Sequence, residues 1–210
     1  MNSPIPQCLA FDIDNTLIFG IEAQAFYKQY GYALEAIFAQ QMKIPLEQAQ
    51  ECLNAYRKAY DGQGERAFDT FALSQTLIYD AFCGVDPLGA LPIMHKTIAT
   101  LDRLQKHTRL IAITDGPVKQ IDRLFAATGI QKEWFTEIIG WERGKEKPKN
   151  GSSRVFKDVI ARYGIAPEEF MMVGDVYSID VEPVRSIGAR AVHIGNSSES
   201  ISDISSLSCI

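Results

Sequence analysis

Two aspartates near the start of the chain are the first residues whose spacing could support chemistry. Asp12 and Asp14 end a short apolar run in the segment LAFDIDNTL, which covers residues 9–17. Alternate residues at the end of a strand point to the same side, so both carboxylates are expected at one edge of a sheet. Two such anions repel each other unless a cation or a functional role compensates. The pair therefore indicates either a functional site or two polar residues that cap a turn.

Three later segments place polar residues at the end of a predicted strand or in the loop after it. Thr114 stands just before a helix that Pro117 can open, where a hydroxyl and backbone N–H groups can hold an anion. The loop 144–149 supplies lysines for a phosphate. Asp175 ends a further strand and Asp180 lies one turn into the next helix, and hard oxygen ligands of this kind suit magnesium. Each segment also has a plain structural interpretation, as a helix cap or a solvated loop.

The elements that must position these residues alternate between strand and helix. Short apolar runs that end in turn signals predict buried parallel strands, and amphipathic segments of helical length lie between the later ones. This alternation is typical of a doubly wound α/β sheet, in which ligands bind at the carboxyl ends of the strands. The predicted strands are Cys8–Phe11, Leu110–Ile113, Ile138–Gly140, Phe170–Val173 and Ala191–Ile194, and the predicted helices are Val118–Ala127, Ser153–Tyr163 and Ser178–Ile187.

The segment 20–91 breaks this alternation, because it contains helix-like stretches and no convincing strand. The stretches are Ile21–Met42, Leu46–Tyr60 and Arg66–Phe82. We therefore expect a helical insert at 20–91 within a core made of residues 1–19 and 92–210. The serine-rich tail, 196–209, is expected to form a docked turn or a frayed terminus.

Composition and charge favour a small soluble ligand. The 210 residues carry a net charge of −5 and the basic residues are scattered, so binding to nucleic acid or to a membrane is not expected. The N-terminus lacks the pattern of a signal peptide, and no apolar run approaches the length of a membrane span. The four cysteines lie far apart without a C-x-x-C pair, which favours reduced thiols in a cytoplasmic protein.

The order of these motifs along the chain resembles that of the haloacid dehalogenase-like hydrolase superfamily. The resemblance rests on DxDxT from Asp12, the strand-end Thr114, the Lys-Pro loop at Lys147 and GDxxxxD from Gly174. A helical insert between the first two motifs is similar to the cap of the subfamily that contains small-metabolite phosphatases, nucleotidases and phosphomutases. The resemblance implies a Rossmann-like, three-layer α/β/α core with a parallel sheet and an inserted helical cap.

The resemblance also implies a role for each aspartate. Asp12 would be the nucleophile that forms an aspartyl-phosphate, and Asp14 would be the general acid and base. Mg²⁺ would be held by the Asp12 side chain, the Asp14 backbone carbonyl and Asp175, with Asp180 in support. An alkoxide leaving group needs a proton and a halide does not, so Asp14 favours cleavage of a phosphate ester over cleavage of a carbon–halogen bond.

Contacts to the phosphate are expected from Thr114 and from a lysine of the Lys-Pro loop. Lys147 is the preferred lysine, and Lys145 stays open because a loop separates Lys147 from the helix that carries Phe156. Asp115 directly follows Thr114. It would therefore place an additional negative charge near the phosphate, unless its side chain turns away to cap the next helix.

The helical insert is expected to open and close over the sheet edge and to contact the part of the substrate beyond the phosphate. Asp61, Gln63 and Arg66 are candidates for that contact, and the alternative for them is a solvated turn. The expected function is a magnesium-dependent phosphohydrolase, a monomer or homodimer, that acts on a sugar phosphate, a nucleoside monophosphate or phosphoglycolate. The alternatives are a phosphomutase with the same nucleophile, a 2-haloacid dehalogenase and a non-catalytic regulatory protein.

Overall fold

The chain divides into two compact units, which are described separately below. The structure is a computed structural model that describes residues 5–60, 64–194 and 201. The sheet unit consists of Met1–Gln24 and Pro87–Ile210, and the helical unit is the intervening segment Ala25–Asp86. The predicted tail 196–209 lies outside the described residues, apart from Ile201, which is buried.

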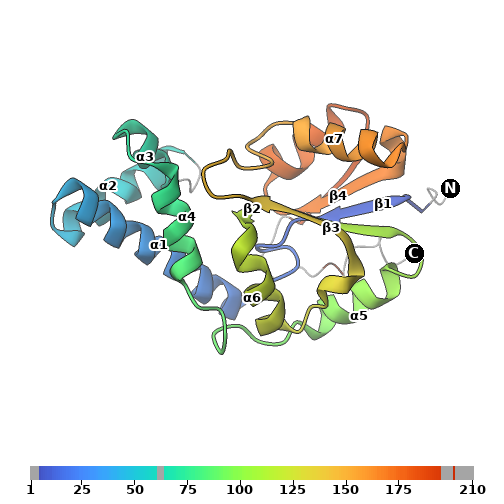
Figure 1. Cartoon of the computed structure of the whole chain (residues 1–210), viewed down its shortest axis with the longest axis horizontal. Coiled ribbons are helices and arrows are strands. Elements are labelled where there is room, and N and C mark those ends of the chain that lie inside the picture. The colour runs from blue at the N-terminus through green and yellow to red at the C-terminus, as the bar shows by residue number, and fades with distance from the viewer. Residues whose placement is uncertain (1–4, 61–63, 195–200, 202–210) are drawn as a thin grey trace. The chain divides into compact units, whose positions relative to one another are not determined.

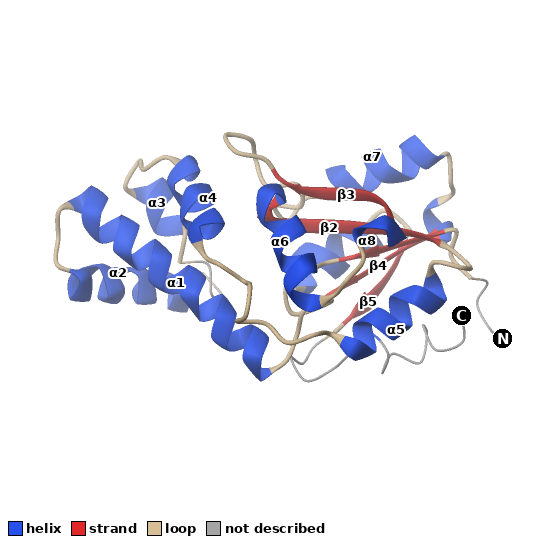
Figure 2. Ribbon diagram, turned by 60° about the horizontal axis from the view of Figure 1, so that its bottom comes forward, coloured by secondary structure: helices blue, strands red, loops and turns tan. Residues whose placement is uncertain are grey.

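The sheet unit is built around strands that are apolar on both faces. In its described part these strands form one parallel sheet with the order β3-β2-β1-β4-β5, and Figure 2 shows them side by side. All residues of β1 are buried, as expected for a strand with helices on both sides. The predicted α/β fold with a parallel sheet is therefore confirmed. The strands are β1 (Cys8–Phe11), β2 (Arg109–Pro117), β3 (Phe135–Trp141), β4 (Phe170–Gly174) and β5 (Arg190–His193).

Helices cover both faces of this sheet. They are α5 (His95–Leu104), α6 (Val118–Thr128), α7 (Arg154–Tyr163) and α8 (Glu182–Arg185), with 3₁₀ turns at Lys132–Trp134 and Pro167–Glu169 and a π turn at Tyr177–Val181. Helix α7 lies on one face, and α5 and α6 lie on the other (Figure 1). Phe156 and Val159 of α7 pack in one apolar cluster with Ala10, Ile111 and Met172 of the strands. Burial of this cluster fixes the strands that carry the polar residues of the sheet edge.

The pairing register places the ends of neighbouring strands level with one another. Phe11 of β1 pairs with Ala112 of β2 and with Val173 of β4. Asp12 directly follows β1, and its backbone N–H donates a hydrogen bond to the carbonyl of Val173 at 2.9 Å. The carboxyl ends of the three central strands therefore reach the same edge of the sheet, where open α/β sheets bind ligands.

The helical unit has its own core. Its described residues form helices without strands: α1 (Ile21–Met42), which begins in the sheet unit, α2 (Leu46–Ala59), α3 (Arg66–Thr70) and α4 (Gln75–Gly84). Phe38 of α1 packs against Phe68 of α3 with ring centroids 5.5 Å apart. The buried Glu35 accepts a hydrogen bond from Arg57 of α2 at 2.7 Å. Apolar packing and an ion pair thus join helices that are distant in the sequence.

Three parts of the chain differ from the predicted elements. The predicted helix Arg66–Phe82 is two helices, because Ala72 adopts a left-handed conformation with φ 53° and Ser74 caps α4 by accepting a hydrogen bond from Thr76. The predicted helix Ser178–Ile187 is the π turn followed by α8. Helix α5 has no counterpart among the predicted elements. None of the described helices combines the length and apolar character needed to cross a membrane.

Candidate active site

Asp12 and a buried lysine form the centre of the candidate site. Asp12 is only 5% exposed, at the point where β1 ends. Its Oδ1 accepts a hydrogen bond from Nζ of Lys149 at 2.7 Å, and the same ammonium donates to Oδ1 of Asp180 at 2.6 Å. Lys149 is only 2% exposed, so this ion pair is shielded from water. A carboxylate and a lysine therefore meet at the carboxyl edge of the sheet.

The lysine at Asp12 is Lys149, and neither of the two predicted lysines occupies that position. Lys147 lies with its Nζ 5.5 Å from the ring centroid of Trp141. Lys145 forms an exposed ion pair with Glu142 at 2.7 Å. The indole N–H of Trp141 also donates to the Lys145 carbonyl at 2.7 Å, which holds this part of the loop beside β3. The sequence favours Lys147, whereas the structure places Lys149 in contact with Asp12.

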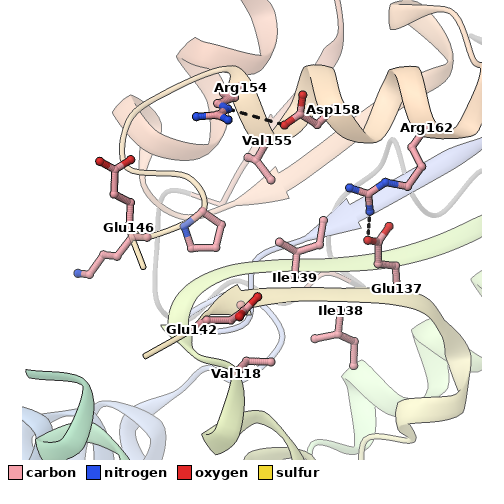
Figure 3. Close-up of a pocket in the computed structure, with 13 residues that line it drawn as sticks. Val118, Glu137, Ile138, Ile139, Glu142, Glu146, Arg154, Val155, Asp158 and Arg162 are labelled. Carbon is pink, nitrogen blue, oxygen red and sulfur yellow. Dashed lines mark hydrogen bonds and ion pairs between the residues drawn. The ribbon is translucent and has the colours of Figure 1, made fainter. Parts of the chain in front are cut away.

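Lys147 is also among the residues that line a groove formed by β3, the loop after it and α7, and Figure 3 shows this groove. The groove has a volume of about 640 Å³, and none of the candidate site carboxylates lines it. Arg154 and Asp158 of α7 approach each other at 4.0 Å on one side of it, and Arg162 pairs with Glu137 of β3. Four of the charged side chains that line the groove thus form two ion pairs.

Asp180 is held in place by three neighbouring groups. It is fully buried. Its second carboxylate oxygen accepts the backbone N–H of Val176 at 3.0 Å, opposite the bond from Lys149. A Cβ on Gly174 would lie 2.3 Å from Cγ of Asp180, so only a glycine leaves room for this carboxylate against the end of β4. This close approach explains the glycine of the GDxxxxD motif.

Asp175 follows β4 and lies beside the same group of acids. Its carboxylate accepts a hydrogen bond from the side chain of Asn15. Asn15 has a left-handed φ of 56°, which asparagine tolerates better than most residues. The backbone carbonyl of Asp175 lies 2.9 Å from Nε2 of His193 at the end of β5. Contacts from the loop after β1 and from the end of β5 therefore fix the position of Asp175.

Thr114 and Asp14 approach one another around Gly116. The pairing of β2 with β3 is irregular between Ile113 and Pro117, so this part of β2 is a bulge. Thr114 is buried, and its hydroxyl oxygen accepts the Gly116 N–H at 2.9 Å. A Cβ on Gly116 would lie 3.2 Å from this hydroxyl and 3.3 Å from Oδ2 of Asp14. The hydroxyl and the second carboxylate thus face the same small space.

Asp115 points away from that space, toward the loop that carries the lysine. Its Oδ1 accepts the backbone N–H of Lys149 at 2.8 Å, and its Oδ2 accepts that of Asn150 at 3.3 Å. Helix α6 has no side-chain hydrogen bond at its N-terminus, so Asp115 does not cap it. The Asp115 side chain therefore turns away from Thr114, but it binds the backbone of the lysine loop and not the start of α6.

The three residues expected to contact the rest of the substrate belong to the helical unit or lie outside the described part. Arg66 is the first residue of α3, and its guanidinium lies 5.2 Å from the ring centroid of Tyr60. Asp61 and Gln63 lie outside the described residues. A role for all three in substrate binding stays a prediction.

Burial and mutual repulsion perturb the carboxylates of the site. Burial raises the pKa of Asp12 well above its ordinary value, and the charge of Lys149 opposes this shift. Burial, followed by the charge of Asp180, raises the pKa of Asp175 to about 6. Burial alone would lower the pKa of Lys149, but the carboxylates of Asp12 and Asp180 raise it overall. The acids therefore carry more negative charge than a single lysine offsets.

The same acids have the geometry and chemistry that suit a divalent cation. Asp12, Asp175 and Asp180 each offer a carboxylate oxygen, and these atoms lie within 4.8 Å of one another. Hard oxygen donors at a buried, negatively charged position are the ligands that Mg²⁺ prefers. A cation at this position would also reduce the repulsion that raises the pKa of Asp175. The residues present therefore fit a magnesium ion.

Two residues of the site are absent from the sequence prediction. Asn15 carries no signal beyond its place directly after Asp14. Lys149 has a signal in its spacing, because it is the last lysine before α7, which begins at Arg154 and carries Phe156. Counting back from that helix, instead of relying on the Lys-Pro pair, would have selected Lys149.

Comparisons with known proteins agree with this fold. A family model described as haloacid dehalogenase-like hydrolase matches residues 6–188. Phosphoserine phosphatase of Thermus thermophilus is 36% identical over 86 residues, which are 40% of this chain and 33% of that protein. The chain thus matches about a third of the length of that relative.

Two further matches extend over most of the chain. Glyceraldehyde 3-phosphate phosphatase of Methanocaldococcus jannaschii is 27% identical over 197 residues, which are 89% of this chain and 83% of that protein. The crystal structure of a HAD phosphatase from Thermococcus onnurineus superposes with a TM-score of 0.63 and 23% identity, over 92% of this chain and 88% of that one. At this identity the superposition shows a shared fold.

Proposed function

Because the chain belongs to the haloacid dehalogenase-like hydrolase family, we propose that it is a phosphatase that hydrolyses a small phosphate monoester through an aspartyl-phosphate on Asp12. The observation that carries this proposal is the buried contact of Asp12 with Lys149 at the carboxyl edge of the sheet. An anionic nucleophile approaches an anionic phosphate only where positive charge offsets their repulsion. Lys149 supplies such a charge beside the nucleophile.

In the first step, a carboxylate oxygen of Asp12 attacks phosphorus, and the bond from phosphorus to the ester oxygen breaks. The departing alkoxide takes a proton from Asp14. In the second step, water attacks the same phosphorus and gives a proton to Asp14, the bond to Asp12 breaks, and inorganic phosphate leaves. Asp14 suits both transfers because its Oδ2 lies near Gly116, on the side of the site where Thr114 presents its hydroxyl.

The remaining residues of the site bind the phosphate and offset its charge. Lys149 and the hydroxyl of Thr114 would bind its oxygens. Asp12, Asp175 and the backbone carbonyl of Asp14 would hold Mg²⁺, which supplies a further positive charge for the oxygens of the transferred group. Asp180, which shares Lys149 with Asp12, orients the lysine.

Asp14 is the residue that separates the proposed reaction from dehalogenation. A halide leaves without a proton, so a dehalogenase has no use for an acid at this position. The two relatives described above are named phosphatases, and the compounds in their names are small phosphate monoesters. We therefore propose a substrate of that class, with the helical unit acting as the cap that contacts its non-phosphate part.

The proposal includes the setting in which the protein works. Cys8 and Cys52 carry free thiols, which is the form expected in the reducing environment of the cytoplasm. We propose a cytoplasmic monomer or homodimer whose ligands are Mg²⁺ and a small phosphate ester.

Release of inorganic phosphate tests the proposal directly. The panel contains phosphoserine, glyceraldehyde 3-phosphate, phosphoglycolate, hexose phosphates and nucleoside monophosphates, each with Mg²⁺ and with a chelator. Asp12→Asn is expected to lower the rate on the best substrate by roughly 10⁴-fold or more, because the nucleophile is lost. Asp122→Asn is the matched control, because Asp122 is exposed on α6 and pairs with Lys132.

Each alternative predicts a different result in this assay. Equal phosphate release by wild type and Asp12→Asn would exclude Asp12 as the nucleophile. Conversion of a sugar phosphate to an isomer without free phosphate would indicate a phosphomutase. Halide release from a 2-haloacid would indicate a dehalogenase. No turnover of any compound by folded wild-type protein would favour a regulatory role.

A further inference from the structure

Asp115 is a charged residue next to the predicted phosphate contact Thr114, and the proposed mechanism does not use it. It follows Thr114 directly, in the bulge of β2. Both oxygens of its carboxylate accept backbone N–H groups of another loop, from Lys149 at 2.8 Å and from Asn150 at 3.3 Å. The carboxylate is therefore aimed at the main chain of the lysine loop.

The backbone of Lys149 is held on both sides. Asp115 accepts its N–H, and its carbonyl accepts the N–H of Ser152 at 2.7 Å. The turn between these contacts contains Asn150 and Gly151, with φ values of 39° and 65°. The left-handed conformation costs glycine little but is unfavourable for Asn150, so the turn keeps this shape only when its surroundings fix it. The bonds from a carboxylate to the N–H groups are charge-assisted and supply that restraint.

The side chain of Lys149 starts from this restrained backbone and reaches two other strand ends. Its Nζ contacts Asp12 after β1 and Asp180 after β4. Asp115 in β2 thus holds the backbone of the lysine whose ammonium contacts the residues that follow β1 and β4. A shift of the loop backbone would move the ammonium away from Asp12, and displacements of about 1 Å in an active site can cost about 100-fold in rate.

We propose that Asp115 is a positioning residue that sets the place of the Lys149 ammonium by anchoring the backbone of its loop. The inference rests on the proposed phosphatase function, in which Lys149 binds the phosphate. In this role Asp115 strengthens phosphate binding, whereas a charge that repels phosphate weakens it. Removing a repelling charge strengthens phosphate binding, whereas removing an anchor weakens it.

Steady-state kinetics and phosphate binding separate these two roles. Asp115→Ala removes both acceptors and is expected to lower kcat/KM by about 10- to 100-fold, as for other residues that orient a catalytic group. Asp115→Asn keeps one carbonyl acceptor for the Lys149 N–H, so it is expected to retain more activity than Asp115→Ala. Inorganic phosphate, titrated in the presence of Mg²⁺, is expected to bind Asp115→Ala more weakly than wild type.

Repeating the Asp115→Ala substitution in Lys149→Met protein tests whether Asp115 acts through the lysine. In Lys149→Met protein the ammonium is already gone, so adding Asp115→Ala is expected to change phosphate affinity by less than about twofold. Tighter phosphate binding in either background would overturn the proposal and establish repulsion instead. Equal and independent losses in the two backgrounds would also overturn it.

Amide hydrogen exchange provides a readout that requires no turnover. The amides of Lys149 and Asn150 are expected to exchange faster in Asp115→Ala than in wild type, and no faster in the control Asp122→Ala. Unchanged exchange at both amides would refute the anchor. If wild type hydrolyses no ester while these amides respond as expected, the phosphatase function fails and the anchoring contact stands.

Discussion

Lys149 is a cation in a buried position between two carboxylates, and its removal has consequences for both. Asp12 and Asp180 each accept a hydrogen bond from it, and without the ammonium they would face each other as uncompensated charges. Breaking a buried pair by removing one partner costs more than the pair itself contributes, because the remaining charge stays desolvated. Substitutions at this residue therefore affect both activity and stability.

A comparison of two lysine variants tests which lysine serves the site. Lys149→Met is expected to lower kcat by roughly 10²–10³-fold, as for the loss of one group that stabilises transition-state charge. Lys147→Met is expected to have a much smaller effect, because Lys147 lies over the ring of Trp141. Phosphate release at saturating substrate gives the two values of kcat. A larger loss of kcat in Lys147→Met than in Lys149→Met would indicate that Lys147 is the lysine that serves the site.

At the scale of elements, Gly174 controls how closely the π turn approaches the end of β4. The space that a side chain would need there is filled by Asp180. The turn is also tied to the strand end because Val176 donates to the Asp180 carboxylate. The end of β4 and the π turn are thus packed and hydrogen-bonded to each other, and the position of Asp180 depends on both.

Gly174→Ala is expected to displace Asp180 and to lower the free energy of unfolding by about 1–3 kcal/mol, the usual cost of overpacking. Urea denaturation followed by circular dichroism measures the change in stability, and phosphate release measures the accompanying loss of activity. Gly84→Ala is the matched control, since a Cβ there meets no atom within 4 Å. A Gly174→Ala protein with wild-type stability would show that the turn adjusts without cost.

The same elements show how far the sequence alone could predict the structure. Buried parallel strands are continuous apolar runs, so β1 and β4 were identifiable from local patterns. The break between α3 and α4 was not, because it depends on a left-handed Ala72, a conformation that alanine rarely adopts. For the lysine the sequence offered two conflicting signals, the Lys-Pro pair at Lys147 and the spacing of Lys149 to α7, and the bonds from Asp115 to the Lys149 loop that separate them are tertiary.

At the scale of the whole molecule, the buried acids make stability depend on pH and on metal. Burial is the main cause that raises the pKa of Asp175 from 3.8 to about 6. The folded state therefore holds this proton more tightly than the unfolded state. Its contribution to stability is fully present below the unfolded pKa and is lost as the pH rises through about 6. A bound cation favours the ionised form and reverses this loss.

Mg²⁺ is therefore expected to raise the melting temperature more at about pH 7.5 than at about pH 5, where a proton competes for the same carboxylate. At about 100 times its dissociation constant, a ligand of the folded state stabilises by about 2.7 kcal/mol. Differential scanning fluorimetry with and without Mg²⁺ at the two pH values measures the shift. Asp175→Asn is the control and should show little Mg²⁺ response at either pH. An equal shift at both pH values would contradict the assignment.

The order of the strands also determines when the protein can fold during its synthesis. Strand β1 pairs through Cys8 with Arg109 of β2 and with Phe170 of β4, so both of its neighbours leave the ribosome long after it does. The helical unit is one continuous segment, Ala25–Asp86, and local contacts form fastest. We expect this segment to fold first on the nascent chain. The apolar strand that precedes the proposed nucleophile would stay unpaired until β2 and β4 emerge, and unpaired apolar strands are prone to aggregation.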